Sequence, residues 1–341
     1  MTRRAIPLIV LAALLVAMLA ASSTAFADEI SLRYEFDAPR DSGRAVPIRI
    51  ARVLLPPGHE AVSADVETEW GPWTEGASFA ADSGVFPLMR GASAQPSTNK
   101  PIPETEIVGT HRLAGASILF VRLVAGRIDG IRTSTARSIA LRVTTRPATV
   151  HERELPFRGL ASDVRRIRAL VDNPSDLDRY SPRASRADAW DMLIVTTADM
   201  ADAFNEYATY KTETFGLTVH VALVEDILAD TTGADTPDKL RNFVRDAYEN
   251  HDARYLILGG DADGLDPAGH LVPARCLWAH AESVTNPCVA GDLYFGNLDG
   301  TWDESGDGVY GEPDDGDGGG EVDLLAEVFV GRIAADDAVE A

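Results

Sequence analysis

The sequence has few cysteines and no strongly basic segment, and both absences exclude functions. Cys276 and Cys288 are its only cysteines, so the regular, close ligand spacing of a structural zinc site is missing. The formal net charge is −22, which argues against nucleic acid as a partner because phosphate binding requires a basic surface. A Gly-x-Ser-x-Gly motif is also missing, so nothing supports a serine hydrolase built on that turn.

The chain has a single long apolar run, which lies at the amino terminus. Arg3 and Arg4 precede the apolar residues 5–21, and a small-residue pattern ends at Ala27. This order predicts a signal peptide, residues 1–27, on a secreted or cell-surface protein. A membrane anchor is the alternative, but it requires a longer span. We expect no stable membrane span once the signal is removed.

The two cysteines predict a disulfide. An exported chain meets an oxidising compartment, and a bond between Cys276 and Cys288 would contribute up to about 3 kcal/mol by loop entropy. Nearby His270 and His280 raise two alternatives, a Cys-His nucleophile and a zinc site. Both are less favoured, because neither the spacing of zinc ligands nor a base next to a cysteine at a strand end is present.

The segments after the signal divide into a β-rich part and an α/β part. Residues 28–158 contain short alternating or aliphatic stretches such as "ISLRYEF", "VPIRIARVLL" and "SIALRVTT", which predict an all-β, sandwich-like domain. Residues 159–189 contain a helical pattern followed by a polar, proline-broken linker. Within this linker we expect Arg183 and Arg186 to be exposed and to be candidate sites of proteolytic processing.

Residues 190–341 alternate strand and helix patterns. "DMLIVTT", "LTVHVALVEDIL", "RYLILGGDADG" and "EVFVGRI" read as strands, and the helix between the second and third is predicted to begin with Thr236 as its N-cap. This order predicts an α/β fold with a parallel sheet and right-handed crossovers. Ligands gather at the carboxyl ends of such strands, where Asp261 and Asp263 lie. The closing "AADDAVEA" predicts the first turn of another helix, so we expect a fragment of a longer protein.

Acidic residues are concentrated in the last part of the chain. From Gly259 to Ala341 there are nineteen Asp and Glu but only two Arg, and such an imbalance favours a bound cation. Six residues match positions one, three, five, six, seven and twelve of a calcium loop: Asp303, Ser305, Asp307, Gly308, Val309 and Asp314. The match is imperfect, because serine stands at the third position, aspartate stands at the twelfth and no clear helices flank the loop. A solvated acidic turn is therefore as well supported as a calcium loop.

Several motifs in order resemble one peptidase family. "DMLIVTTADMADAFNEYATYKTETFGLTVHVALVEDIL", "LRNFVRDAYE", "RYLILGGDAD", "GDLYFGNLDGTWDESGDGVYGE" and "VDLLAEVFVGRIAA" are similar to the first part of the catalytic domain of gingipain-like cysteine peptidases. The resemblance spans about Trp190 to Ala335. It implies a caspase-like (Rossmann-like) α/β sandwich, here truncated, preceded by a β-rich pro-region. The family's His-Gly turn and Ala-Cys strand end would follow "EVFVGRI" and are not reached, so no catalytic residue is assigned.

The resemblance also implies a structural calcium site. Its carboxylate ligands would be Asp261, Asp323 and Glu327, with backbone oxygens at Leu325 and at or near Asp299. The expected function is therefore a secreted cysteine endopeptidase precursor that acts on protein or peptide substrates. The alternative is a calcium-dependent binding or surface protein that keeps the scaffold without the chemistry.

Overall fold

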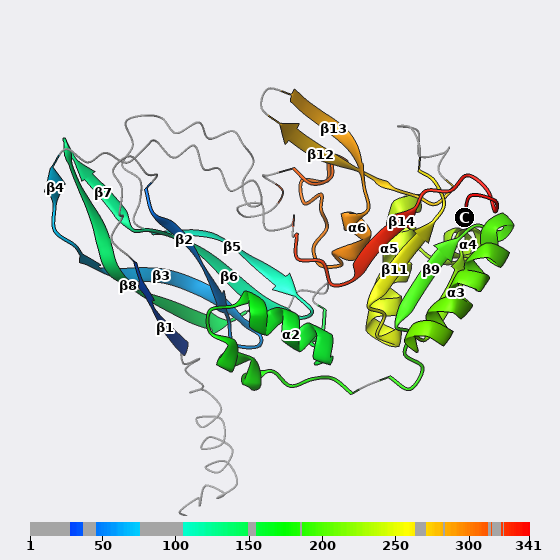
Figure 1. Ribbon diagram of the computed structural model, residues 1–341, viewed down its shortest axis with the longest axis horizontal. Helices are drawn as coiled ribbons and strands as arrows, with labels where there is room; N and C mark the ends of the chain where they lie inside the picture. The colour runs from blue at the N-terminus through cyan, green and yellow to red at the C-terminus, as the bar shows by residue number, and fades with distance from the viewer. Residues whose placement is uncertain are drawn as a thin grey trace, which may run out of the picture.

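The computed structural model describes residues 28–36, 46–75, 105–148, 155–184, 186–262, 271–281, 284–312, 315, 322 and 324–341 (Figure 1). The predicted signal peptide lies outside these residues. An antiparallel β unit is followed along the chain by an α/β unit, and helix α2 lies between them (Figure 1). The expected fold class, a parallel-sheet α/β unit preceded by antiparallel β structure, is confirmed.

The larger sheet of the β unit is organised around its longest strand. That strand, β8, pairs antiparallel with each of the other four. The sheet contains β1 (Asp28–Glu35), β3 (His59–Trp70), β4 (Thr74–Glu75), β7 (Gly126–Asp129) and β8 (Arg132–Pro147). Residues of β8 alternate between buried and more exposed positions along much of its length, which is the period of a strand with one face packed on a core.

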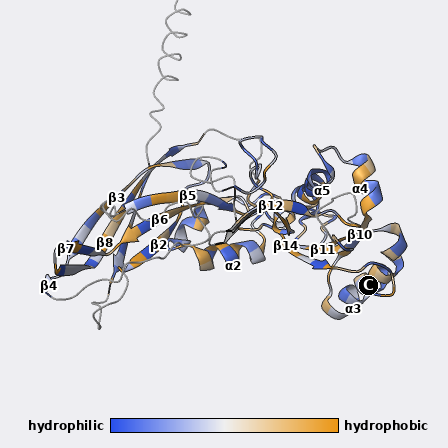
Figure 2. Ribbon diagram, turned by 90° about the horizontal axis from the view of Figure 1, so that it is seen from above, coloured by the Kyte–Doolittle hydropathy of each residue, from blue (hydrophilic) through white to orange (hydrophobic). Residues whose placement is uncertain are grey.

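A smaller antiparallel sheet packs against the larger one. It has the order β2 (Ile48–Leu54), β6 (Ala116–Val124) and β5 (Thr105–Leu113). Val53, Val121 and Leu123 from this sheet share one buried cluster with Ile139 and Leu141 of β8. Apolar and polar residues alternate along the strands (Figure 2), so each sheet turns one apolar face inward, as in a sandwich.

Helix α2 (Ala161–Leu170) covers the outer face of the smaller sheet. Its buried Ile167 packs in a cluster with Ile118 and Phe120 of β6. The following segment was predicted to be an irregular linker, but it contains a 3-10 helix, η1 (Pro174–Arg179). Asn173 stabilises this turn on the sheet, since its side chain accepts a hydrogen bond from the Leu54 N–H at 2.7 Å and donates one to the Leu54 carbonyl at 2.9 Å.

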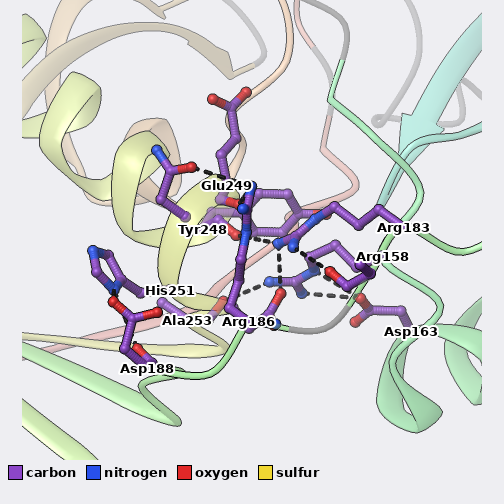
Figure 3. Close-up of polar contacts among 12 residues, drawn as sticks. Arg158, Asp163, Arg183, Arg186, Asp188, Tyr248, Glu249, His251 and Ala253 are labelled. Carbon is purple, nitrogen blue, oxygen red and sulfur yellow. Dashed lines mark hydrogen bonds and ion pairs between the residues drawn. The ribbon is translucent and has the colours of Figure 1, made fainter.

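Arginines fasten the linker to the end of helix α5 (Thr236–His251), as Figure 3 shows. The Arg158 side chain is fully buried, pairs with Asp163 at 2.9 Å and donates to the Ala253 carbonyl at 2.9 Å. Arg183 pairs with Asp252 at 2.5 Å and its side chain is 15% exposed. The expectation that Arg183 is exposed is therefore wrong, because the acidic residue that ends α5 holds it. Arg186 is exposed, as expected.

The α/β unit contains a four-stranded parallel sheet. Its order is β10 (Val219–Leu223), β9 (Met192–Thr196), β11 (Tyr255–Gly259) and β14 (Phe329–Ile333). All five residues of β9 are buried, as expected for a central strand with helices on both faces. The register of β14 on β11 pairs Phe329 with Tyr255 and Ile333 with Gly259, which places the residues before β14 at the amino end of the sheet.

Helices cover both faces of this sheet. Phe204 and Ala208 of α3 (Ala201–Phe215) pack on one face with Ile194. The other face is covered by α5, by α4 (Val224–Asp230) and by α6 (Leu293–Gly296), whose apolar residues share a second cluster. Gly216 ends α3 in the left-handed conformation at φ 67°, as its position in the sequence predicts.

One sequence prediction in this unit needs correction, and the predicted disulfide is confirmed. The N-cap of α5 is Asp235, whose carboxylate accepts the Asp238 N–H at 2.9 Å, and not Thr236. Cys276 and Cys288 form the predicted disulfide. Both cysteines lie on strands, because β12 (Arg275–Ala281) and β13 (Val284–Gly291) form a hairpin. The terminal segment after β14 forms a single turn, in which the Ala341 N–H donates to the Asp337 carbonyl at 3.2 Å, as the predicted first turn of a helix requires.

Within the described part of the chain, no helix combines the length and apolar character needed to cross a bilayer. The amino-terminal apolar run lies outside those residues.

The buried Arg158–Asp163 pair provides a test of how the linker is anchored. Replacing Arg158 with Met leaves the Asp163 carboxylate buried without its partner, and we expect a loss of about 3–5 kcal/mol in unfolding free energy by urea denaturation. The matched control is Arg146→Met, which breaks an exposed pair with Glu60 and is expected to lose less than about 1 kcal/mol. Equal losses in the two variants would contradict the assignment.

Candidate metal centre

A buried acidic pair lies where the α/β unit meets the β unit. Asp299 follows α6 and is 4% exposed, and Glu327 precedes β14 and is 1% exposed. Neither carboxylate oxygen of Asp299 has a hydrogen-bond partner among the described residues. A buried carboxylate without donors is costly, so this pair is the strongest candidate for a bound cation in the described chain.

Helix α5 fixes the backbone that carries Asp299. Arg241 is 5% exposed, and its guanidinium donates to the carbonyls of Asn297, Asp299 and Gly300 at 2.7–3.1 Å. The Asp299 carbonyl, the atom that the resemblance suggested as a ligand, therefore already accepts a hydrogen bond. The side chain of Asp299, not its carbonyl, supplies the oxygens without donors.

Glu327 is positioned by two backbone donors from different units. Its Oε2 accepts the Leu298 N–H at 2.9 Å, and its Oε1 accepts the N–H of Ala114 at 3.4 Å. Ala114 belongs to the turn between β5 and β6 of the β unit. One carboxylate therefore joins the α6–Asp299 segment, the lead into β14 and the amino-terminal β unit.

Burial dominates the electrostatics of the pair. It raises the pKa of Asp299 above its ordinary value, and the positive charges of Arg112, Arg245 and Arg241 oppose that shift. Glu327 also lowers the pKa of Asp299 through a side-chain hydrogen bond, which two carboxyl groups form only when they share a proton. When both are ionised, neither oxygen of Asp299 has a donor in the described part of the chain. A positive charge is therefore the partner that the ionised pair needs.

Asp261 lies at the opposite end of the sheet. Its N–H donates to the Ala335 carbonyl at 3.1 Å, so it lies beside a residue eight positions beyond Glu327. At the rise of an extended strand this places Asp261 and Glu327 on the order of 20 Å apart. The structure therefore does not bring Asp261 together with Glu327, as the parallel register of β11 and β14 requires.

The predicted calcium loop is closed by its own backbone. Asp303 accepts the N–H groups of Gly306, Asp307 and Gly308 at 2.8–3.1 Å. Asp307 accepts the Val309 N–H at 2.9 Å, and the Ser305 hydroxyl lies 3.4 Å from Asp303. These contacts describe a folded acidic turn, and they leave both of the sequence-based interpretations open.

Asp315 is a loop residue that the sequence pattern did not identify. It lies one position after the predicted ligand Asp314 and is 1% exposed. Its carboxylate accepts the N–H groups of Ser305 and Glu312 at 3.4 and 3.1 Å. Burial raises its pKa, and the charges of Asp303 and Asp307 act in the same direction. Because Asp315 directly follows another aspartate, the sequence alone gives no reason to select it as the buried one.

The remaining predicted ligands are Asp314, Asp323 and Leu325. Asp314 and Asp323 lie outside the described residues. Leu325 packs its side chain against the cluster formed by α2 and the smaller sheet. No group of three His, Cys, Asp or Glu side chains that could hold a metal ion occurs within the described ranges. The pair Asp299 and Glu327 nevertheless offers the oxygen ligands that hard divalent cations prefer.

These features define an α/β domain with a parallel sheet, helices on both faces and a buried acidic pair at its amino end. Residues 185–341 match the model of peptidase family C25. The chain therefore carries a domain of this family, the gingipain family, in agreement with the resemblance of its motifs.

Comparison with solved structures gives two similarities. The crystal structure of dimeric latent PorU from Porphyromonas gingivalis has a TM-score of 0.31 and 13% identity, over 94% of this chain and 38% of that chain. A structure described as a protease has a TM-score of 0.29 and 17% identity, over 49% and 28%. This chain thus spans less than two fifths of either protein. Among curated proteins, nothing matches.

The contrast between Asp299 and Asp303 gives a test of these environments. In the presence of a chelator at neutral pH, Asp299→Asn removes a buried charge that accepts no hydrogen bond from an N–H or O–H donor. The change is expected to raise the unfolding free energy by about 1–3 kcal/mol. The same change at Asp303 removes an acceptor of backbone N–H groups and is expected to lower it by about 1 kcal/mol. Urea denaturation measures both, and a loss of stability in both variants would show that Asp299 is already compensated.

Proposed function

We propose that this protein is a secreted cysteine endopeptidase precursor. The observation that carries the proposal is the C25 domain at residues 185–341, built on a four-stranded parallel sheet. Membership of a peptidase family supports protein or peptide substrates. Secretion is supported by the disulfide between Cys276 and Cys288, which is typical of oxidising compartments, and by the predicted signal peptide.

The chemistry would be that of a thiolate and a histidine. The thiolate attacks the peptide carbonyl, and the histidine protonates the leaving amine. Cys276 and Cys288 are not proposed as the nucleophile, because a disulfide has no thiolate to offer. No residue of this chain is assigned a catalytic role.

We assign the β-rich residues 28–158 to a pro-region. This assignment is supported by their fold, which is separate from the parallel sheet, and by two contacts with the C25 domain. The Arg158 side chain donates to the Ala253 carbonyl, and the Ala114 N–H donates to Glu327. Of the two predicted processing points, exposed Arg186 suits a protease better than Arg183, which is held by Asp252.

Calcium is proposed as a structural cation of the domain. Asp299 and Glu327 would supply carboxylate oxygens, and the Leu325 carbonyl and Asp323 would complete the shell. The orphaned oxygens of Asp299 support this assignment, as does the chemistry of the donor set. When bound, the ion would stiffen the junction and take no part in peptide cleavage. The loop from Asp303 to Asp314 would hold a second ion or none.

Calcium titration tests the cation. Saturating calcium is expected to raise the Tm of the chelator-treated chain by about 5 °C, because the ion binds only the folded state. Asp299→Asn and Glu327→Gln should abolish that gain, whereas Asp65→Asn, an exposed aspartate on β3, should keep it. Isothermal titration of Asp303→Asn counts the ions: loss of one bound ion would assign a second site to the loop. A Tm unaffected by calcium would remove the proposal.

The peptidase assignment is tested on the complete secreted protein with fluorogenic peptides. Hydrolysis should be abolished by thiol alkylation under conditions that leave disulfides intact. The double variant Cys276→Ser/Cys288→Ser should keep its activity while losing about 3 kcal/mol of stability. Activity that resists alkylation would exclude a cysteine nucleophile. No hydrolysis at all would favour the calcium-dependent binding protein instead.

A further inference from the structure

The linker is exposed where it approaches the parallel sheet. Ala184, Arg186, Ala187 and Asp188 are all exposed to solvent. The Arg186 guanidinium makes only long contacts, with the Asn250 side chain at 3.3 Å and the Glu249 carbonyl at 3.4 Å. Exposed connecting segments with few backbone contacts are the preferred sites of proteolysis. A protease that prefers basic residues would therefore cut after Arg186.

The acidic residue at the end of α5 binds this part of the linker. Asp252 is 6% exposed and adopts the left-handed conformation at φ 60°. Its Oδ1 accepts the Arg183 guanidinium at 2.5 Å, and its Oδ2 accepts the Arg186 N–H at 3.3 Å. Figure 3 shows both arginines at this end of the helix. The first contact is short and charge-assisted, whereas the second is long for a hydrogen bond from an N–H group. Oδ2 is thus the less well satisfied oxygen of a buried carboxylate.

Both donors lie on the amino-terminal side of the Arg186–Ala187 bond. Cleavage of this bond and departure of the β unit would remove the Arg183 guanidinium and the Arg186 N–H together. Asp252 would then have no partner among the described residues, and a buried charge that has lost its partner is strongly unfavourable. The cleaved domain therefore needs another cation at this carboxylate.

Trp190 anchors the chain on the other side of the bond. Its ring stacks between those of His220 and His251, with ring centres 3.9 and 3.7 Å from its own. Its N–H donates to the His251 carbonyl at 2.6 Å. His251 directly precedes Asp252, so this anchor holds the chain beside the carboxylate whether or not the linker is cut.

The new amino terminus would lie within reach of Asp252. Ala187 is three residues from Trp190, so its nitrogen stays within about 10 Å of the anchor. The nitrogen of the preceding residue, Arg186, is already 3.3 Å from Oδ2. A shift of the chain by one residue, about 3.8 Å, brings the Ala187 nitrogen to the same place.

We propose that Asp252 binds the amino terminus that cleavage after Arg186 creates. This inference rests on the processing of the pro-region proposed above. Water breaks the C–N bond: its oxygen stays on Arg186 as a carboxylate, and both of its protons pass to the Ala187 nitrogen, which becomes an ammonium. The ammonium brings a full charge and three donors to Oδ2, while Arg183 still holds Oδ1. Once the β unit leaves, the ammonium is the partner of the whole carboxylate.

This exchange of partners keeps the carboxylate paired before and after processing. In the uncut chain its cation is an arginine of the linker, and in the cut chain its cation is the amino terminus of the domain. The end of α5 and the lead into the central strand β9 thereby stay joined in both forms.

Acylation of the new amine tests the contact. The whole chain is cut with a limited amount of trypsin, and the carboxyl-terminal product is expected to begin at Ala187. A succinimidyl ester near neutral pH then labels the new terminus, and mass spectrometry gives the rate. Only the neutral amine reacts, so pairing with Asp252 should make acylation about tenfold slower in the cut wild type than in cut Asp252→Asn. Asparagine also adopts the left-handed conformation, so this variant keeps the turn that ends α5.

Two further variants complete the test. Asp188→Asn is the matched control, because Asp188 directly follows Ala187 and its side chain is 70% exposed, and it should change the rate by less than about twofold. Arg183→Gln removes the competing cation from Asp252 and should slow acylation about threefold further. Equal rates in the wild type and Asp252→Asn, or faster acylation in Asp188→Asn or Arg183→Gln, would overturn the proposal.

The inference and the proposed peptidase fail in different ways. Added trypsin makes the cut, so a lack of peptide hydrolysis by the complete protein would refute the peptidase and leave the role of Asp252 standing. A linker that resists trypsin at Arg186, or a new terminus that reacts as a free amine, would refute the inference without bearing on the peptidase.

Discussion

The parallel pairing of β14 with β11 is the constraint on which the rest of the structure depends. It sets the direction of β14, so that Glu327 lies at the amino end of the sheet and faces the β unit. The same pairing carries the chain past Asp261 only eight residues later. Acidic residues that look interchangeable in the sequence are thereby divided between opposite ends of one sheet.

At the amino end of the parallel sheet, the α/β unit and the β unit contact each other through charged and polar groups as well as apolar side chains. The α/β unit contributes a buried pair of carboxylates, and the β unit contributes Arg112 and the Ala114 N–H. Burying such a pair is unfavourable unless something positive compensates it. This contact therefore differs from the apolar packing of α5 on the sheet.

Patterns in the sequence predicted much of the architecture but little of the site. The strands at 191–197 and 327–333, the helix ended by Gly216 and the disulfide follow from local rules of periodicity, capping and compartment. The hairpin of β12 and β13 was missed because its strands show no regular alternation of apolar and polar residues and β13 is interrupted by Pro287. Arg241, Arg112 and Ala114 could not be found, because each reaches the pair from a segment distant in the chain.

The sequence by itself determined the class of the domain, since alternating strand and helix patterns and the family's motifs are local properties of residues 185–341. It also supplied the carboxylates. Only the tertiary structure decided which of them are buried, and which lie together. Asp299 and Glu327 are 28 positions apart, and their arrangement depends on α6, on the contacts of Arg241 and on a turn 213 positions before Glu327. Burial and long-range contacts arise from packing, which no local pattern encodes.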